Sequence, residues 1–271
     1  MNNKIFTKKE IFAQLEALGA PSDRVVLVHT SLRAVGAVEG GAQGLLDVMI
    51  EYFTRGGGLL CIPAHTWHNL GREITLDMNS SDTCLGALAK VAAEDGRGIR
   101  TENPTHSMVI FGDRVRAEKF AENEARVTTP TAPEGCYGRL YSEGGYVLLI
   151  GVAQNRNTYL HSVDEMLKIS NRMASNPEKV AVIRTTGEII RRELTLYETD
   201  YTSDISERFV KYDTAFRYHR CVRDGFVGNA PTLLCDAVKM AEVVKLIYEN
   251  SGKADPLCDE APIPQRIYCN L

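Results

Sequence analysis

The sequence predicts an α/β fold in which helices cover both faces of a central, mixed and largely parallel sheet. Short, continuously apolar runs, typical of strands buried on both faces, occur at 25–28, 59–62 and 146–152. Segments with helical periodicity separate these runs. The first two runs and the helical segment 41–55 between them form a strand–helix–strand unit, which predicts a parallel pair of strands.

Local signals predict where the elements begin and end. Thr7 and Glu10 have the spacing of a capping box, and Gly19 supplies the end of the first helix. Gly56–Gly58 ends the helical segment before the second strand, which Pro63 closes. Farther along, the patterns predict a helix over 84–93, a strand over 108–111, helices over 157–168 and 203–216, and another helix over 230–248.

One segment predicts antiparallel pairing. Thr185–Glu188 separates two strand-like runs, 180–184 and 189–196, and this hairpin signal predicts that the sheet is mixed. No linker rich in Pro, Ser or Gly divides the chain, so we expect residues 1–271 to form a single domain. The proline-containing tail, 251–271, is expected to be irregular.

Composition restricts the classes of function. The formal net charge is −4 and there is no basic run, which argues against nucleic acid as a partner and suits a cationic small molecule. No stretch approaches the roughly 18 apolar residues of a membrane span. Residues 1–12 lack the apolar core of a signal peptide, and the seven scattered cysteines are odd in number. These features predict reduced thiols in a cytoplasmic protein, and a homo-oligomer is compatible with them.

The first candidate for chemistry is the segment 29–41, which runs from a strand into a glycine-containing loop and then into a helix. Such a turn offers backbone N–H groups to phosphates, and Arg33 would add charge-assisted hydrogen bonds. A tight turn without a ligand explains the same residues. The stretch 33–38 nearly matches the R-x-x-G-x-G/A loop of the commoner acetyltransferase superfamily, but Val38 breaks that match.

Two polar loops form the next candidates. Pro63–His68 follows a strand end, where α/β sheets place their ligand crevices. His65 and His68 could bind a metal on a helix, but no carboxylate at a set spacing joins them, so a pocket wall or loop packing is the preferred interpretation. The loop 101–109 leads into a strand, and Asn103 before a proline favours an extended or turn conformation.

The fourth candidate, 157–165, follows the clearest buried strand. On a helix, His161 and Glu165 would share one face. A carboxylate beside an imidazole raises its basicity and fixes its tautomer, as a general base requires. The same spacing is common between ordinary residues on a helix surface, so the spacing alone leaves both interpretations open.

Taken together and in this order, these segments resemble the aminoglycoside N3-acetyltransferase family. Residues 29–41 match its H-[ST]-S-L-x-x-[IVL]-G-x-[VI]-x-G-G signature nearly residue for residue, and the resemblance extends over residues 7–250. Other segments resemble further motifs of the family: Gly58–Pro63 its glycine-led strand ending in proline, Asn103–Gly112 its loop with Pro and Ser before a strand, Tyr137–Leu140 its Y-G-x-L, Gly145–Gly151 its V-L-L-x-G-V, Thr158–Glu165 its T-x-x-H-x-x-x-E, and Gly225–Ala230 its short glycine-containing segment near the C-terminus.

The resemblance implies that residues 1–271 are one acetyltransferase domain, with an α/β fold distinct from the commoner acetyltransferase superfamily. It implies acetyl-CoA as donor, the 3-amino group of a 2-deoxystreptamine aminoglycoside as acceptor, and no metal. His161 would be the general base, and Glu165 would orient it or help to hold the cationic substrate. Thr66 or a nearby backbone N–H is expected to hydrogen-bond the thioester oxygen. The residues expected to bind acetyl-CoA lie in two loops: His29, Thr30, Ser31, Leu32, Arg33, Val35, Gly36, Asn103, Thr105, His106, Ser107, Met108 and Val109.

Two positions depart from the family pattern on the acceptor side. Family members often carry small residues and an aromatic near His65, and an acidic residue at Asn229. The same transfer to a non-antibiotic primary amine, or CoA binding without catalysis, therefore stays open. Cys61 and Cys84 are interpreted as core residues rather than nucleophiles, because neither has an adjacent histidine. The remaining alternative, a metal-dependent hydrolase, would use His65, His68, His106 and His161.

Overall fold

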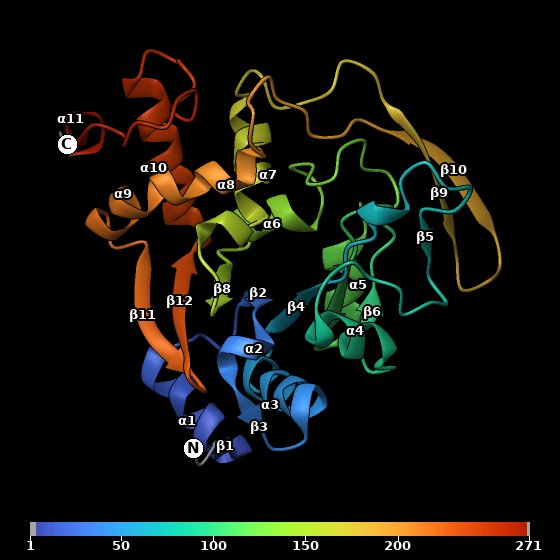
Figure 1. The fold of residues 1–271 in the computed structure, drawn as a ribbon. Helices are drawn as coiled ribbons and strands as arrows, with labels where there is room; N and C mark the ends of the chain where they lie inside the picture. Colours follow the sequence, from blue (N-terminus) through green and yellow to red (C-terminus); the bar gives the residue numbers. More distant parts are fainter. Residues whose placement is uncertain (1–3, 270–271) are drawn as a thin grey trace.

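The computed structural model describes residues 4–269, which form a central mixed sheet with helices around it (Figure 1). The strands of this sheet lie in the order β11 (Val222–Val227), β12 (Ala230–Asp236), β8 (Tyr146–Ile150), β2 (Val25–Thr30), β4 (Leu59–Pro63), β7 (Met108–Phe111) and β6 (Ile99–Arg100). Strand β2 pairs in parallel with β8 and β4, and the pairings outside these three strands are antiparallel. The predicted mixed α/β sheet is confirmed, with its parallel part confined to the three central strands.

Helices cover both faces of the sheet, as predicted. One face is covered by α1 (Lys8–Leu18), α3 (Gly41–Thr54) and α4 (Ala87–Glu94). The opposite face is covered by α5 (Arg114–Ala121), α6 (Cys136–Ser142), α7 (Tyr159–Leu167), α9 (Asp213–Tyr218) and α10 (Ala237–Asn250). Successive side chains of a strand point to opposite faces. Accordingly, Val26 and Val28 join the first core, whereas Val25 and Leu27 join the second.

A second sheet stands apart from the central one. The predicted hairpin is present as β9 (Glu178–Ile183) and β10 (Ile189–Leu194), which pair antiparallel. It pairs with the short strand β5 (Leu76–Asp77) rather than with the central sheet (Figure 1). The hairpin was correctly located, but the expectation that it makes the central sheet mixed is wrong, because β7 and β12 supply the antiparallel pairings there.

The ends of α1 follow the predicted signals. Thr7 and Glu10 form a reciprocal capping box, and Gly19 ends the helix in the left-handed region at φ 67°. The short elements are β1 (Ile5–Phe6), which pairs in parallel with β3 (Ala37–Val38), the helices α2 (Leu32–Val35), α8 (Ile205–Arg208) and α11 (Gln265–Tyr268), and the 3-10 turns η1 (Trp67–Asn69), η2 (Gln154–Arg156) and η3 (Phe209–Tyr212).

The prediction of a continuous helix over 230–248 is wrong in its first part. Residues 230–236 form β12, which pairs with β8, and Asp236 then caps the start of α10 by accepting a hydrogen bond from the backbone N–H of Lys239 at 3.1 Å. Cross-strand pairing, which local periodicity does not report, decided this segment. Residues 251–269 of the predicted tail are irregular apart from α11, residues 270–271 lie outside the described part, and Asp255 ties the tail to the buried Arg172 side chain at 2.6 Å.

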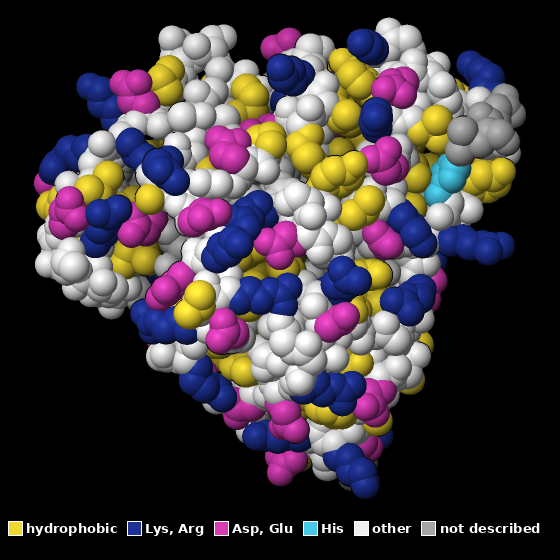
Figure 2. Space-filling view, turned by 180° about the vertical axis from the view of Figure 1, so that it is seen from behind, with side chains coloured by type: hydrophobic (Ala, Val, Ile, Leu, Met, Phe, Trp, Pro, Cys, Tyr) yellow, Lys and Arg dark blue, Asp and Glu magenta, His cyan; other side chains and the backbone are white. Residues whose placement is uncertain are grey.

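The surface mixes charges of both signs. Figure 2 shows Lys and Arg interspersed with Asp and Glu across the face that it draws. Within residues 4–269, no helix is both long enough and apolar enough to cross a membrane. All seven cysteines are unpaired, and Cys61, Cys136, Cys221 and Cys235 are buried.

Candidate active site

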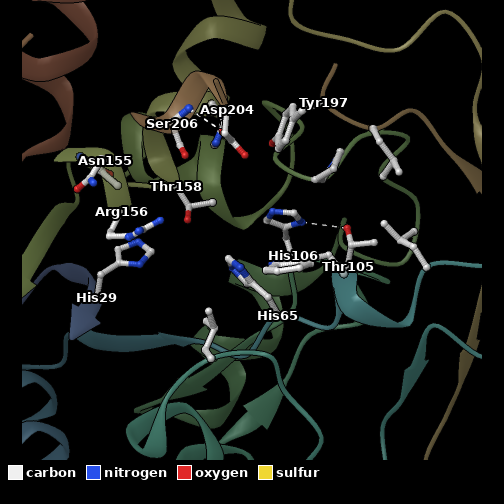
Figure 3. Close-up of a pocket in the computed structure, with 17 residues that line it drawn as sticks. His29, His65, Thr105, His106, Asn155, Arg156, Thr158, Tyr197, Asp204 and Ser206 are labelled. Carbon is white, nitrogen blue, oxygen red and sulfur yellow. Dashed lines mark hydrogen bonds between the residues drawn. The ribbon is translucent and has the colours of Figure 1, made fainter. Parts of the chain in front are cut away.

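Four histidines meet at one edge of the central sheet. His29 lies near the carboxyl end of β2, and His65 follows the carboxyl end of β4. Because β7 runs antiparallel, its start lies at the same edge, so that His106 just before it joins them. His161 comes from α7, the helix after β8. All four line a cavity of about 390 Å³, and Figure 3 shows His29, His65 and His106 pointing into it from different sides.

The rest of the cavity wall is partly apolar and partly polar. Trp67 and Leu70 follow β4, and Tyr197 comes from the segment after β10. The charged side chains among the lining residues are Arg156 and Asp204. Asp204, the carboxylate of the wall, comes from the C-terminal third of the chain. In Figure 3 it lies across the cavity from His65.

Two of the histidines have hydrogen-bond partners inside the protein. Nε2 of His65 lies 2.8 Å from the Tyr137 hydroxyl, and Nδ1 of His106 lies 3.0 Å from the Thr105 hydroxyl. Their rings lie side by side, with centroids 4.4 Å apart. Burial lowers the pKa of His106 to about 3 and that of His65 well below its usual range, so that both rings are neutral at neutral pH.

His161 differs from these two. Its ring stacks on Tyr197 with centroids 4.2 Å apart, and Phe209 packs against it edge-on. Its side chain is buried, but its ring nitrogens form no hydrogen bond with another described residue. Burial lowers the pKa of His161 to about 4, although the Asp204 charge acts in the opposite direction. The ring is therefore neutral and free to accept a proton from a molecule in the cavity.

Glu165 lies on the same helix but contacts other groups. Its carboxylate accepts hydrogen bonds from the hydroxyls of Thr129, Thr131 and Tyr197, the last at 3.3 Å. Burial raises the pKa of Glu165, and these three hydrogen bonds oppose that rise. Tyr197 thus contacts both Glu165 and His161, and links them indirectly.

The loop after β2 is a tight, well-packed turn. Ser31 caps α2, with its hydroxyl 3.4 Å from the backbone nitrogen of Ala34. Gly36 has φ 87°, and a Cβ built there would lie 2.8 Å from the side-chain nitrogen of Asn229. The backbone N–H of Asn229 also donates to the Val35 carbonyl at 2.9 Å. Of the predicted acetyl-CoA residues in this loop, Val35 is fully buried in the core, Arg33 is exposed, and His29 lines the cavity.

The loop before β7 is fixed by the Asn103 amide. Its oxygen accepts from the backbone N–H of His106 at 2.9 Å, and its nitrogen donates to the Pro130 carbonyl at 2.9 Å. Thr105 and His106 consequently line the cavity. The other predicted acetyl-CoA residues here point elsewhere: the Ser107 hydroxyl donates to the Ala64 carbonyl, and Met108 and Val109 belong to the two cores.

Thr66 and His68 are also committed to the protein. The Thr66 hydroxyl donates to the Pro104 carbonyl at 2.8 Å, and its backbone N–H donates to Thr105, so neither hydrogen is available to a thioester oxygen. His68 pairs with Asp82 at 3.2 Å. Among residues 4–269, no three His, Cys, Asp or Glu side chains are grouped as a metal site requires, so the hydrolase alternative lacks a ligand set there.

Comparison with known proteins identifies the family. The family model described as aminoglycoside 3-N-acetyltransferase matches residues 27–249. The chain belongs to this family. It is therefore an acyltransferase of the aminoglycoside 3-N-acetyltransferase type, and the resemblance seen in its motifs is confirmed.

Three members of the family illustrate the likeness. Aminoglycoside N(3)-acetyltransferase IV of Salmonella sp is 26% identical over 250 residues, which cover 92% of this chain and 88% of the relative. A histidine-to-alanine variant of AAC(3)-IVa, solved in complex with a gentamicin, is 25% identical with a TM-score of 0.74, over 89% of this chain and 88% of that one. AAC-IIIb, solved with CoASH, is 21% identical with a TM-score of 0.76, over 93% and 100% of the two chains.

Sequence reasoning about this aminoglycoside 3-N-acetyltransferase homologue missed several cavity residues. Trp67 lies in the loop 63–68 that the sequence already singled out, and Arg156 lies just before the candidate segment 157–165, but neither has a spacing that marks it. Tyr197 and Asp204 come from the region after the hairpin, where no motif was recognised. Asp204 has one usable signal, because an Asp just before a short helix is typical of an N-cap, and its carboxylate does accept from the backbone N–H of Ser206 at 2.8 Å.

Proposed function

We propose that this chain transfers the acetyl group of acetyl-CoA to the 3-amino group of a 2-deoxystreptamine aminoglycoside, with His161 as the general base. The observation that carries this proposal is the neutral His161 ring, whose nitrogens are unpaired within the described residues and which lines the cavity at the edge of the sheet. Family membership supports both the donor and the type of acceptor.

Acetyl-CoA is proposed to lie along two loops at this edge of the central sheet, the loop after β2 and the loop before β7. His29 lies near the end of β2, just before the first loop, and Thr105 and His106 lie in the second loop. All three line the cavity, so both loops border it. The CoASH complex of AAC-IIIb, which shares the fold, supports this type of donor. Seven unpaired thiols support a cytoplasmic location for the enzyme.

The acceptor is proposed to enter beside Asp204. This exposed carboxylate lines the cavity and would attract an ammonium group. The indole of Trp67, which is also exposed, offers an apolar surface to the carbon face of a ring. A cationic, ring-containing amine such as the gentamicin held by AAC(3)-IVa combines both features.

The transfer itself requires a base rather than a covalent intermediate. As the unprotonated amine nitrogen forms a bond to the acetyl carbon, its remaining hydrogens become strongly acidic, so that a weak base such as His161 suffices. The carbon–sulfur bond then breaks, CoA leaves as a thiolate, and the proton held by His161 restores the thiol. Glu165 would act on His161 through Tyr197 rather than by direct contact.

Direct turnover tests the proposal. Purified protein would be incubated with acetyl-CoA and a panel of aminoglycosides and simple primary amines, and mass spectrometry would locate the acetyl group in each product. Acetylation at the 3-amino group is expected. Turnover only on amines outside the antibiotic class would assign a different acceptor, and no turnover on any amine, despite acetyl-CoA binding, would contradict catalysis.

A further inference from the structure

His29 carries a buried polar atom that has no partner. The residue lies in β2, in the middle of the central sheet, where it pairs in register with Leu149 of β8. Its side chain is 9% exposed and lines the cavity. Nε2 of its ring is buried and forms no hydrogen bond with the described residues. Buried polar atoms in native proteins are nearly always paired, so an unpaired one on a cavity wall requires a partner from the cavity, which a ligand group can supply.

Three polar groups near His29 are already hydrogen-bonded within the described part of the protein, whereas Nε2 of His29 is not. Nε2 of His65 pairs with Tyr137, Nδ1 of His106 pairs with Thr105, and Thr66 donates to the Pro104 carbonyl. Among the cavity histidines, His29 and His161 are thus the two whose rings form no hydrogen bond within residues 4–269. Acetyl transfer needs two such groups, a hydrogen-bond donor that stabilises the oxyanion and a base that takes the proton.

We propose that Nε2–H of His29 donates a hydrogen bond to the thioester carbonyl oxygen of the acetyl donor, and stabilises the negative charge that this oxygen gains during transfer. This assignment rests on the proposed acetyl transfer. It replaces the Thr66 hydroxyl, whose hydrogen the Pro104 carbonyl already accepts. His29 is therefore a catalytic residue rather than only part of the wall that binds acetyl-CoA.

The surroundings of His29 suit a donor rather than a base. Burial lowers its pKa to about 3, so that the ring stays neutral and one nitrogen keeps its hydrogen. A neutral imidazole in an apolar setting can polarise a carbonyl without first gaining a charge. The central strand also fixes the backbone of His29, which pairs with Leu149 of β8 before the substrate arrives.

His29 and His161 would divide the work between them. His161 lies on α7 and would take the proton from the attacking amine, while His29 lies on β2 and would bind the carbonyl oxygen of the donor. Figure 3 draws His29 on the opposite side of the cavity from His106 and Thr105, with His65 between them. If the two rings have these separate roles, removal of either ring should lower turnover, while the remaining ring keeps its own role.

Two substitutions at His29 test the assignment. His29→Leu keeps much of the volume but removes the donor, and should lower kcat about 10²- to 10³-fold, with the Kd of acetyl-CoA near that of the wild type. His29→Gln places an amide N–H at a similar reach and should recover part of the loss. An unchanged kcat in His29→Leu, or a change confined to acetyl-CoA affinity, would overturn the proposal.

A measurement on the ring itself keeps the test independent of folding. Nitrogen NMR of histidine-labelled His161→Ala protein with acetyl-CoA should find His29 neutral and protonated at Nε2, with the signal assigned by its loss in His29→Gln. An unprotonated Nε2 would exclude a donor role. Failure of the proposed acetyl transfer can be told apart from failure of the role proposed for His29, because in the first case the wild-type enzyme would show no turnover on any amine.

Discussion

The imidazole of His161 stacks on the phenol ring of Tyr197, with ring centroids 4.2 Å apart and ring planes 12° apart. The Tyr197 hydroxyl then reaches the Glu165 carboxylate at 3.3 Å. A histidine and a glutamate four residues apart on one helix are therefore joined through a tyrosine from a different part of the chain. This arrangement predicts that the ring of Tyr197 matters more to catalysis than its hydroxyl.

Substitutions at Tyr197 separate the ring from the hydroxyl. Tyr197→Leu removes the stacked face and should lower kcat about 2- to 10-fold, because aromatic pairs contribute roughly 0.5–1.5 kcal/mol beyond their buried area. Tyr197→Phe keeps the stack, and should cost less, as should Glu165→Gln. Steady-state kinetics of the three variants decides the matter. A loss in Tyr197→Phe as large as in Tyr197→Leu would assign the effect to the hydroxyl and Glu165.

Stability should fall as the medium becomes acidic, because the cavity histidines are buried and neutral. Burial lowers the pKa of His161 to about 4 and those of His29 and His106 to about 3, below the unfolded value of about 6.5. Between these limits the unfolded chain binds more protons than the native one, so each histidine removes roughly 1.4 kcal/mol of unfolding free energy per pH unit lost. Above pH 6.5 this contribution is constant.

Urea unfolding at pH 7.5, 6.0 and 5.0 measures this dependence. The free energy of unfolding should drop below pH 6.5, and His161→Asn should reduce the slope by the share of one histidine. A free energy that does not change between pH 7.5 and 5.0, in both proteins, would show that these rings are not buried in neutral form.

A matched pair of glycines tests the loop that is proposed to hold the donor. Gly36 and Gly57 have φ of 87° and 84°, but a Cβ at Gly36 would lie 2.8 Å from the Asn229 side chain, whereas nothing lies within 4 Å at Gly57. Alanine at either position should lower the melting temperature, because an L side chain is strained there. Only Gly36→Ala should also raise the Kd of acetyl-CoA in calorimetry. Equal affinities in the two variants would separate this loop from donor binding.

Thiol titration tests the cysteine assignment. All seven cysteines are unpaired, but Cys258 is the exposed one, and the four in the cores are shielded. A thiol reagent should therefore react fastest with Cys258 in the native protein and more slowly with the half-buried Cys84 and Cys269, and Cys258→Ser should abolish the fastest phase. Under denaturing conditions all seven should react. A lower count in protein prepared without oxidation would contradict both the unpaired cysteines of the structure and the proposed cytoplasmic location.

The elements that could be predicted from the sequence are those whose own residues carry a clear apolar pattern. The runs 25–28, 59–62 and 146–152 are apolar at nearly every position, so they predicted the central strands and, through their ends, the edge that carries the site. The segment 230–236 was assigned to a helix because its pairing with β8 is a long-range property. A strand at this position depends on its neighbour more than on its own periodicity.

The side-chain partners in the site show the same limit. Spacing indicated that His161 and Glu165 share a helix face, but not that Tyr197 lies against both. The Thr66 hydroxyl suited a thioester oxygen on the basis of its place in the sequence, yet the Pro104 carbonyl already accepts its hydrogen. Hydrogen-bond saturation of this kind follows from tertiary contacts, which a single sequence does not contain.

The most direct test of the proposed chemistry is the turnover of His161→Ala with acetyl-CoA and an amine that the wild-type enzyme accepts. General-base catalysis contributes typically about 10²- to 10⁴-fold, so kcat should fall by that factor. The Kd of acetyl-CoA should stay near the wild-type value, which shows that the cavity is intact. If His161→Ala acetylates the amine at close to the wild-type rate, His161 is structural, and the base is another of the cavity histidines.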